Sequence, residues 1–124
     1  AGDDELASLL QVVAVNSFDL PSRGCAVHTL ASRANHSCQP NTLMRVESSG
    51  SVTCVAIRPL APGDEVTWSY LAECHLLRPH RERQHRLQRW GFQCQCPRCC
   101  GHDDVRAMLC PVCRRGALRP MLEP

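Results

Sequence analysis

The stretch "ANHSCQPN" (34–41) sets an asparagine, a histidine, a serine and a cysteine side by side, with a proline two residues later. The proline stiffens the turn, because its ring fixes one backbone dihedral angle. In a purely structural interpretation, His36 is a satisfied histidine, and Asn35 and Asn41 are turn residues. Cys38 is then a small buried hydrophobe. The functional interpretation gives these side chains a shared site, and the other cysteines bear on that choice.

The chain is 124 residues long, enough for one small domain or for part of a larger one. Its net charge of +2 is too small to predict nucleic-acid binding by itself. Positive charge is concentrated between Arg78 and Arg98, where six arginines face Glu82 alone. We interpret this basic stretch as the solvated face of a helix, and an acidic partner is the alternative. We do not expect direct nucleic-acid binding.

The apolar stretch "LASLLQVVAV" (6–15) follows acidic residues and precedes no small-residue cleavage site, so we do not interpret it as a signal peptide. It is also too short to span a membrane. Cysteine thiols stay reduced in proteins that are not secreted. We therefore expect no membrane association, a reducing compartment, and a nuclear and/or cytoplasmic location.

Ten cysteines are a high density for a chain of this length, and their spacing decides what they do. A secreted disulfide scaffold is one interpretation. Close C-x-C and C-x-x-C spacings suit zinc better, because neighbouring thiolates can converge on one tetrahedral ion. Six of the ten crowd into twenty residues, namely Cys94, Cys96, Cys99, Cys100, Cys110 and Cys113.

The C-x-C-x-x-C run at 94–99 supplies three ligands, whereas structural zinc takes four. The adjacent Cys100 would reach the same ion only under strain, and Cys110 and Cys113 are further candidates. Cys38 is the candidate from far upstream. On spacing alone, Cys38 is as consistent with a buried hydrophobe as with a ligand.

The motif "CPVC" (110–113), with a glycine soon after it, is similar to half of a zinc ribbon. It predicts a second, incomplete zinc site at Cys110 and Cys113. Cys100 and His102 could complete a local site, but we favour a site whose other half lies elsewhere.

Apolar residues recur at helical spacing in "DDELASLLQVVAVNSF" (3–18), which predicts an amphipathic helix capped by Asp3 or Asp4. The last third of the chain has almost no apolar periodicity, so a metal would have to organise it. The predicted fold class is α+β. The other expected elements are a turn at 19–24, strands at 42–47 and 51–60 joined by a hairpin turn, a turn at 61–65, a strand at 65–70, and a helix at 76–90 with Pro79 in its first turn and Gly91 at its end.

Three motifs in this order, "NHSCQPN", "GDEVTWSY" and "FQCQCPRC", resemble the SET domain of protein-lysine methyltransferases, and look closest to the SET-and-MYND family. The N-S-F segment at 16–18 and the basic helix follow the same family order. The continuation "CPVCRRGALRP" resembles a divergent branch of that family. Each motif alone is weak, but the ordered set, which covers roughly residues 12–120, is specific.

The resemblance implies a role for each matching residue. Tyr70 would be the catalytic residue, with its hydroxyl at the methyl-transfer centre, and Phe18 and Trp68 would line the substrate channel. Packing alone is the alternative role for the aromatic residues. The implied binding residues for S-adenosylmethionine are Asn35, His36, Tyr70, Trp90 and Phe92. The implied ligands of a post-SET Zn²⁺ are Cys38, Cys94, Cys96 and Cys99.

The resemblance also implies an architecture. Residues 1–90 would be the carboxy-terminal portion of a SET domain, with 34–41 in its pseudoknot, and 91–124 a cysteine-rich post-SET zinc region. The G-x-G motif of the family's amino-terminal half and the zinc-binding MYND insert are absent from this sequence. We therefore expect a fragment or a degenerate homologue that is inactive on its own.

The implied function is transfer of methyl groups from S-adenosylmethionine to a lysine of a histone or another protein. A non-catalytic, zinc-stapled interaction or regulatory module is the alternative, and a zinc-binding nucleic-acid module is a weaker one. A G-x-G segment encoded before this chain would favour the enzyme, and salt-sensitive DNA binding would favour the third hypothesis.

Overall fold

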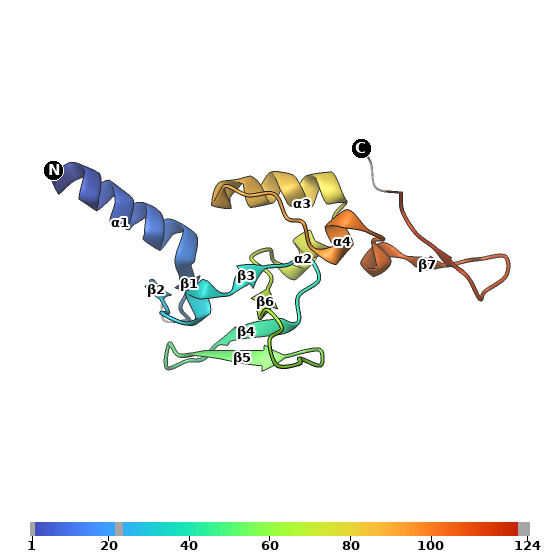
Figure 1. Cartoon of the computed structure of the whole chain (residues 1–124), viewed down its shortest axis with the longest axis horizontal. Coiled ribbons are helices and arrows are strands. Elements are labelled where there is room, and N and C mark those ends of the chain that lie inside the picture. Colours follow the sequence, from blue (N-terminus) through green and yellow to red (C-terminus); the bar gives the residue numbers. More distant parts are fainter. Residues whose placement is uncertain (1, 22–23, 122–124) are drawn as a thin grey trace. The chain divides into compact units, whose positions relative to one another are not determined.

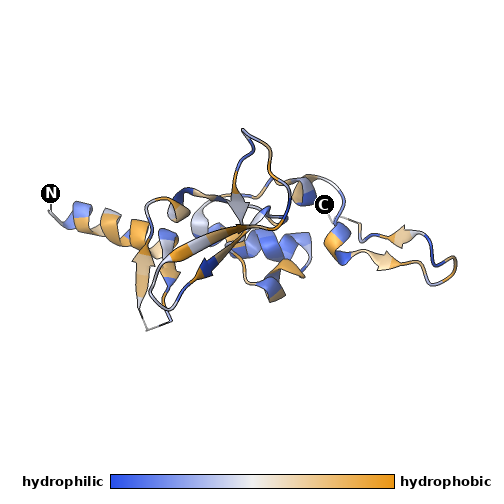
Figure 2. Cartoon of the chain, turned by 90° about the horizontal axis from the view of Figure 1, so that it is seen from below, coloured by the Kyte–Doolittle hydropathy of each residue, from blue (hydrophilic) through white to orange (hydrophobic). Residues whose placement is uncertain are grey.

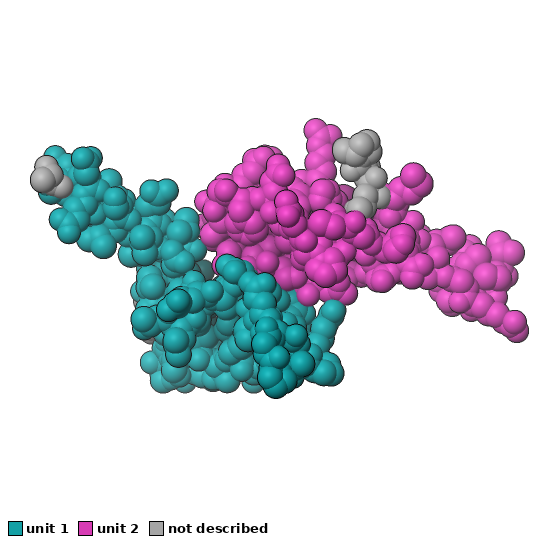
Figure 3. Space-filling model, viewed as in Figure 1, with its two compact units in different colours: residues 1–35, 40–68 teal, residues 36–39, 69–124 magenta. Residues whose placement is uncertain are grey.

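The computed structural model describes residues 2–21 and 24–121, and the chain divides into two compact units. Unit 1 comprises residues 1–35 and 40–68, and unit 2 comprises residues 36–39 and 69–124 (Figure 3). The four residues His36–Gln39 therefore belong to unit 2, although the sequence on both sides of them belongs to unit 1.

Unit 1 begins with helix α1, Gly2–Asn16 (Figure 1). Its acidic residues suit the positive end of the helix dipole. The prediction that Asp3 or Asp4 caps the helix is wrong, because the helix begins at Gly2 and both aspartates lie inside its first turn. The helix also ends two residues earlier than predicted, because the next residues enter a strand. No residue of α1 is buried within the described part of the chain.

Two antiparallel hairpins follow in unit 1. Strand β1 (Ser17–Asp19) pairs with β2 (Cys25–Val27), and β4 (Thr42–Val46) pairs with β5 (Val52–Ala56). The turn between β4 and β5 contains Gly50 at a φ of 85°, a left-handed conformation that favours glycine. The predicted hairpin is therefore confirmed, with its second strand ending at residue 56. A 3₁₀ turn, η1, covers Ala31–Arg33.

The predicted strand at 65–70 is shorter than expected. Only β6 (Thr67–Trp68) is a strand, and it forms a two-stranded sheet with β3 (Asn35–His36). Ser69 bends the chain just after it, because its hydroxyl donates to the carbonyl of Leu71 at 2.8 Å and accepts from the amide of Leu71 at 3.1 Å. These local bonds compete with a sheet ladder for the backbone groups.

Asn41 fixes the strand β6 within unit 1. Its side-chain oxygen accepts from the Thr67 amide at 2.8 Å, and its side-chain nitrogen donates to the Glu65 carbonyl at 2.8 Å. Its own carbonyl accepts from the Ile57 amide at 2.9 Å. Asn41 is therefore more than a turn residue, because it ties two distant segments together.

Unit 2 contains short helices in place of the single helix predicted at 76–90. The helix is interrupted because Pro79 adopts an extended ψ of 158° and serves as the N-cap of α3 rather than lying in its first turn. The predicted end is confirmed, since Gly91 closes the helix at a φ of 76°. The elements are α2 (Glu73–Leu76), α3 (His80–Leu87), η2 (Gln88–Trp90), α4 (Pro97–Cys100), η3 (Asp104–Arg106), β7 (Met108–Leu109) and β8 (Ala117–Leu118).

The core of unit 2 is built largely from cysteines. Leu71 and Leu87 are its buried aliphatic residues, and they lie in one cluster with Cys38, Cys94 and Cys99. Burying a leucine stabilises a fold by about 1.5–3 kcal/mol, so two leucines contribute little against the entropy of ordering this unit. Unit 2 therefore depends on whatever holds its cysteines together.

Within the described ranges, no helix combines the length and the apolar character needed to cross a bilayer.

The apolar stripe of α1 generates a prediction. Leu9 and Leu10 are 58% and 61% exposed, and apolar residues recur along this helix in the hydropathy view (Figure 2). Replacing both with glutamine should raise the solubility of the chain. The free energy of unfolding in urea should change by less than about 1 kcal/mol, because neither side chain is buried.

Phe18→Ala is the matched control, because Phe18 is buried in the same unit. It should destabilise the chain by about 3–5 kcal/mol. A loss of similar size in the double leucine variant would contradict the exposed position of the stripe.

Candidate metal centre and aromatic cluster

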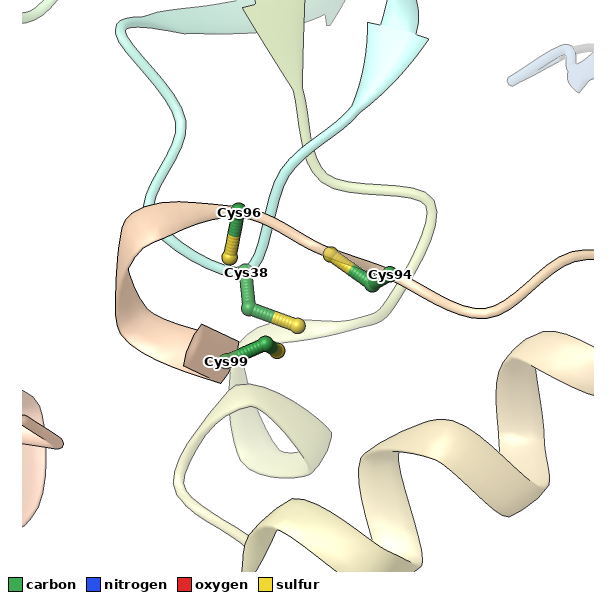
Figure 4. Close-up of side chains that lie close together, drawn as sticks. All are labelled: Cys38, Cys94, Cys96 and Cys99. Atoms are coloured by element: carbon green, nitrogen blue, oxygen red, sulfur yellow. The ribbon is translucent and has the colours of Figure 1, made fainter. Parts of the chain in front are cut away.

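Four cysteines converge in unit 2. Their sulfur atoms all lie within 4.8 Å of one another, and Cys38, Cys94 and Cys99 are buried (Figure 4). Cys38 reaches the cluster from the loop after β3, Cys94 and Cys96 come from the segment that leads into α4, and Cys99 lies within α4. Spacing alone is equally consistent with Cys38 as a metal ligand and as a buried hydrophobic residue. In the structure, its sulfur atom lies beside the sulfur atoms of the other three cysteines.

Local hydrogen bonds position the cluster. The Cys96 carbonyl accepts from the amides of Cys99 at 2.8 Å and of Cys100 at 3.0 Å, which starts the short helix α4 with Pro97 at its first position. Proline suits that position, because its missing N–H would have no helical partner there. Gln84 of α3 makes two hydrogen bonds with the backbone of Cys94. The Cys94 amide donates to Gln84 Oε1 at 2.9 Å, and Gln84 Nε2 donates to the Cys94 carbonyl at 2.8 Å.

The donor set fits zinc. Four thiolates about 2.3 Å from one tetrahedral zinc have sulfur atoms about 3.8 Å apart, which a cluster confined to 4.8 Å can reach with small side-chain movements. Hydrogen bonds with Cys94, Cys96 and Cys99 raise the pKa of Cys38. The hydrogen bond with Cys38, helped by that with Cys99, outweighs the opposing one with Cys94 and lowers the pKa of Cys96 to about 5. The thiols thus share protons, and a divalent cation would replace those protons.

His36 donates to the cluster. The Tyr70 amide donates to His36 Nδ1 at 3.0 Å, so the proton of the neutral imidazole resides on Nε2. His36 Nε2 lies 3.3 Å from Cys38 Sγ and therefore donates to that sulfur. This chain of contacts connects a cysteine of the cluster to the backbone of Tyr70. Both ring nitrogens of His36 therefore have partners within the chain, as expected of a structural histidine.

Charged residues that sequence reasoning missed surround the cysteines. Arg83, Arg98 and Asp103 are all buried, although the basic stretch predicted a solvated helix face. Burial disfavours the charge of Asp103, but the hydrogen bonds and charge of Arg98, and then of Arg83, outweigh burial and hold the pKa of its carboxyl below the usual range. Arg83 lies four residues before the buried Leu87, and this shared helix face was the available signal.

Four aromatic rings gather in unit 2 beside the cysteines. The ring centroid of Tyr70 lies 5.4 Å from that of His36, 5.3 Å from Trp90 and 6.2 Å from Phe92. Phe92 also lies 6.0 Å from His36. Tyr70, Trp90 and Phe92 are half-buried against the core. Four residues predicted to bind a cofactor are therefore neighbours.

These aromatic residues fit the adenine ring or an alkyl group of S-adenosylmethionine, because their faces supply apolar contact in a partly buried position. His36 has no ring nitrogen to offer, since both are engaged inside the chain. Any hydrogen bond from His36 to a cofactor would come from its backbone. Asn35 lies in unit 1, where its side-chain nitrogen donates to the Glu65 carboxylate at 2.7 Å. The roles of both residues toward a cofactor stay predictions.

The two residues predicted for the substrate channel are together in unit 1. The rings of Phe18 and Trp68 stack with centroids 4.9 Å apart, and His28 meets Phe18 edge-on at 5.6 Å. The Trp68 indole nitrogen donates to the Ala34 carbonyl at 3.1 Å. These contacts form the packed centre of unit 1, and the channel role stays a prediction.

Cys110 and Cys113 occupy a tight turn between β7 and β8. The Cys110 amide donates to the Gly116 carbonyl at 2.7 Å, and the Gly116 amide donates to Cys113 Sγ at 3.4 Å. Backbone hydrogen bonds from Arg115 and Gly116 lower the pKa of Cys113. Among the described residues, the four-cysteine cluster does not include Cys110 or Cys113, so this pair could supply at most half of a zinc site.

All ten cysteines lie in the described part of the chain, and each is a free thiol. The disulfide-scaffold interpretation therefore has no support in the structure.

Sequence comparison relates this chain to known proteins. A sequence profile of the SET domain matches residues 9–71. The chain is similar to the histone-lysine N-methyltransferase SET5 of Meyerozyma guilliermondii, with 32% identity over 68% of this chain and 18% of the relative. It is similar to the protein-lysine N-trimethyltransferase SMYD5 of Mus musculus, with 34% identity over 68% and 21%.

A SET and MYND domain-containing protein of Dictyostelium discoideum is 30% identical over 64% of this chain and 22% of its own length. The chain spans about a fifth of the length of the curated relatives it matches. The profile match extends over half of the chain and includes the "NHSCQPN" and "GDEVTWSY" motifs. The chain therefore belongs to the SET domain family.

Proposed function

We propose that this chain is part of a protein-lysine methyltransferase that transfers methyl groups from S-adenosylmethionine to lysine side chains of histone or other proteins. The observation that carries the proposal is the link from the four-cysteine cluster through His36 to Tyr70. One loop supplies a zinc ligand and also fixes the backbone of the tyrosine that the family places at its transfer centre. The names of the relatives support the reaction class.

S-adenosylmethionine, when bound, supplies a methyl group on a positively charged sulfur. The hydroxyl of Tyr70 would orient the lysine amine and accept weak C–H···O contacts from the methyl group. Trp90 and Phe92 would exclude water and favour the neutral, nucleophilic form of the amine. Positioning supplies most of the catalysis in such a direct displacement, so no strong general base is needed.

We also propose the finer architecture. Residues 1–90 form the carboxy-terminal portion of the SET domain, and 91–124 form a post-SET zinc region with Cys38 as its fourth ligand. The grouping of residues 36–39 with residues 69–124 supports a pseudoknot in which 34–41 takes part. Ten free cysteines support a reducing compartment, hence a nuclear or cytoplasmic location.

A second zinc site at Cys110 and Cys113 completes the proposal. The amide donors around Cys113 favour its thiolate, which is the form that binds metal. Its remaining ligands come from outside the described cluster.

The metal site yields the first test of this function. The chain should purify with a tightly bound zinc, and Cys38→Ser should lose that zinc and make unit 2 sensitive to limited proteolysis. The reason is that zinc binding contributes about 10 kcal/mol or more of folding free energy in such segments. Elemental analysis without added chelator measures the metal content.

Cys54→Ser is the matched control, because Cys54 is exposed on β5 and lies outside the cluster. It should keep the metal. A Cys38→Ser variant with full metal content would show that Cys38 is only a core residue.

Tyr70 yields the second test, in the full-length protein that contains this chain. Tyr70→Phe keeps the ring and its packing against Trp90, but it removes the hydroxyl. The methylation rate should fall about a hundred-fold or more, because one well-placed polar group in a dry site contributes about 2–4 kcal/mol to the transition state. The affinity for S-adenosylmethionine and the melting temperature should change much less.

A structural role for the hydroxyl predicts the reverse pattern, a lower melting temperature with the rate retained. That result would overturn the assignment of Tyr70 and favour the non-catalytic zinc module. Measuring rate and melting temperature on the same preparation separates the two outcomes.

A further inference from the structure

Three charged side chains are buried around the cysteine cluster. Arg83 is 0% exposed, and Arg98 and Asp103 are each 1% exposed. Removing an ion from water costs several kcal/mol unless the protein pairs it well. Apolar side chains of similar size would fill the same space without that cost, so these charges have a role beyond packing.

Asp103 holds the two arginines together. Arg98 binds its carboxylate with two hydrogen bonds, from Nε to Oδ1 at 2.5 Å and from Nη2 to Oδ2 at 3.2 Å. Arg83 Nη1 donates to Oδ2 at 3.1 Å. One carboxylate cancels only one of the two guanidinium charges, so the group carries a net charge of +1.

One further donor of each arginine reaches a cysteine, and Arg83 Nη1 also donates to the Arg78 carbonyl at 2.7 Å. Arg83 Nη2 lies 3.7 Å from Cys99 Sγ, and Arg98 Nη1 lies 3.2 Å from the Cys38 carbonyl. A guanidinium can only donate, so the sulfur of Cys99 is the acceptor. A thiolate accepts such a bond far better than a thiol does, because it is charged.

We propose that Arg83, Arg98 and Asp103 form a positioning clamp that holds the cysteine cluster in its metal-binding geometry and offsets the negative charge of its thiolates. Zinc with four thiolates has a net charge of −2, and the clamp supplies +1 beside it. The clamp rests on the metal site of the proposed function, and it is independent of methyl transfer.

The test compares Arg83→Met with Arg81→Met in the full chain. Arg81 lies on the same helix α3 and is exposed, so it is a matched control. Zinc affinity is measured by competition with a chromophoric chelator. Arg83→Met should weaken zinc binding by about 10–100-fold, the usual effect of removing a partner that contacts a metal ligand. Arg81→Met should stay within about twofold of the unsubstituted chain.

Asp103→Asn tests the positioning part of the clamp, with the exposed Asp104→Asn as its control. Asp103→Asn makes the charge beside the cysteine cluster more positive, but it removes the carboxylate that binds both Arg83 and Arg98. It should weaken zinc binding about tenfold if the carboxylate positions the arginines. An unchanged or tighter affinity would overturn that role.

Thermal unfolding with and without zinc separates the clamp from simple packing. The clamp predicts a larger loss of melting temperature in the zinc-loaded chain than in the zinc-free chain, whereas packing predicts equal losses. If Arg83→Met does not fold, Arg83→Lys decides, because it keeps the charge but loses the forked donor. A zinc affinity at least threefold weaker supports the clamp, and an unchanged affinity overturns it. An unsubstituted chain that binds no zinc would instead refute the metal site itself.

Discussion

The convergence of Cys38 with Cys94, Cys96 and Cys99 is the constraint on which unit 2 depends. These thiols come from two segments that are far apart in the sequence and close together in the structure. The apolar core around them is small. Two buried leucines contribute a few kcal/mol, whereas a structural zinc contributes about 10–16 kcal/mol. The proposed zinc would therefore be the dominant cross-link of unit 2, and it would organise a tail with almost no apolar periodicity.

The same constraint connects metal binding to the aromatic cluster. Cys38 and His36 lie two residues apart, and His36 contacts Cys38 Sγ on one side and receives the Tyr70 amide on the other. A shift of the loop would therefore move the backbone at Tyr70. The stretch at 34–41 contributes to both clusters, because its histidine accepts from the Tyr70 amide and its cysteine joins the other three cysteines.

Sequence reasoning succeeded where a local pattern carried the information. Local spacing predicted the hairpin at β4 and β5, the helix end at Gly91 and the close grouping of the three cysteines of the C-x-C-x-x-C run. Sequence reasoning failed where contacts between residues distant in sequence determine the structure. The spacing of Arg83 and Leu87 puts both on one face of α3, but the partners that let a buried Arg83 keep its charge, Asp103 and Cys99, are distant in sequence. The structure divides the helix predicted at 76–90, because Pro79 is the N-cap of α3 and not a residue of its first turn.

The central claim is that one zinc is bound by four sulfurs, with Cys38 among them. X-ray absorption at the zinc edge tests it most directly, on the chain carrying Cys110→Ser and Cys113→Ser so that a single site remains. The expected result is one zinc per chain with four sulfur neighbours at about 2.3 Å. A shell of three sulfurs with one nitrogen or oxygen, or a folded chain without zinc, would contradict it.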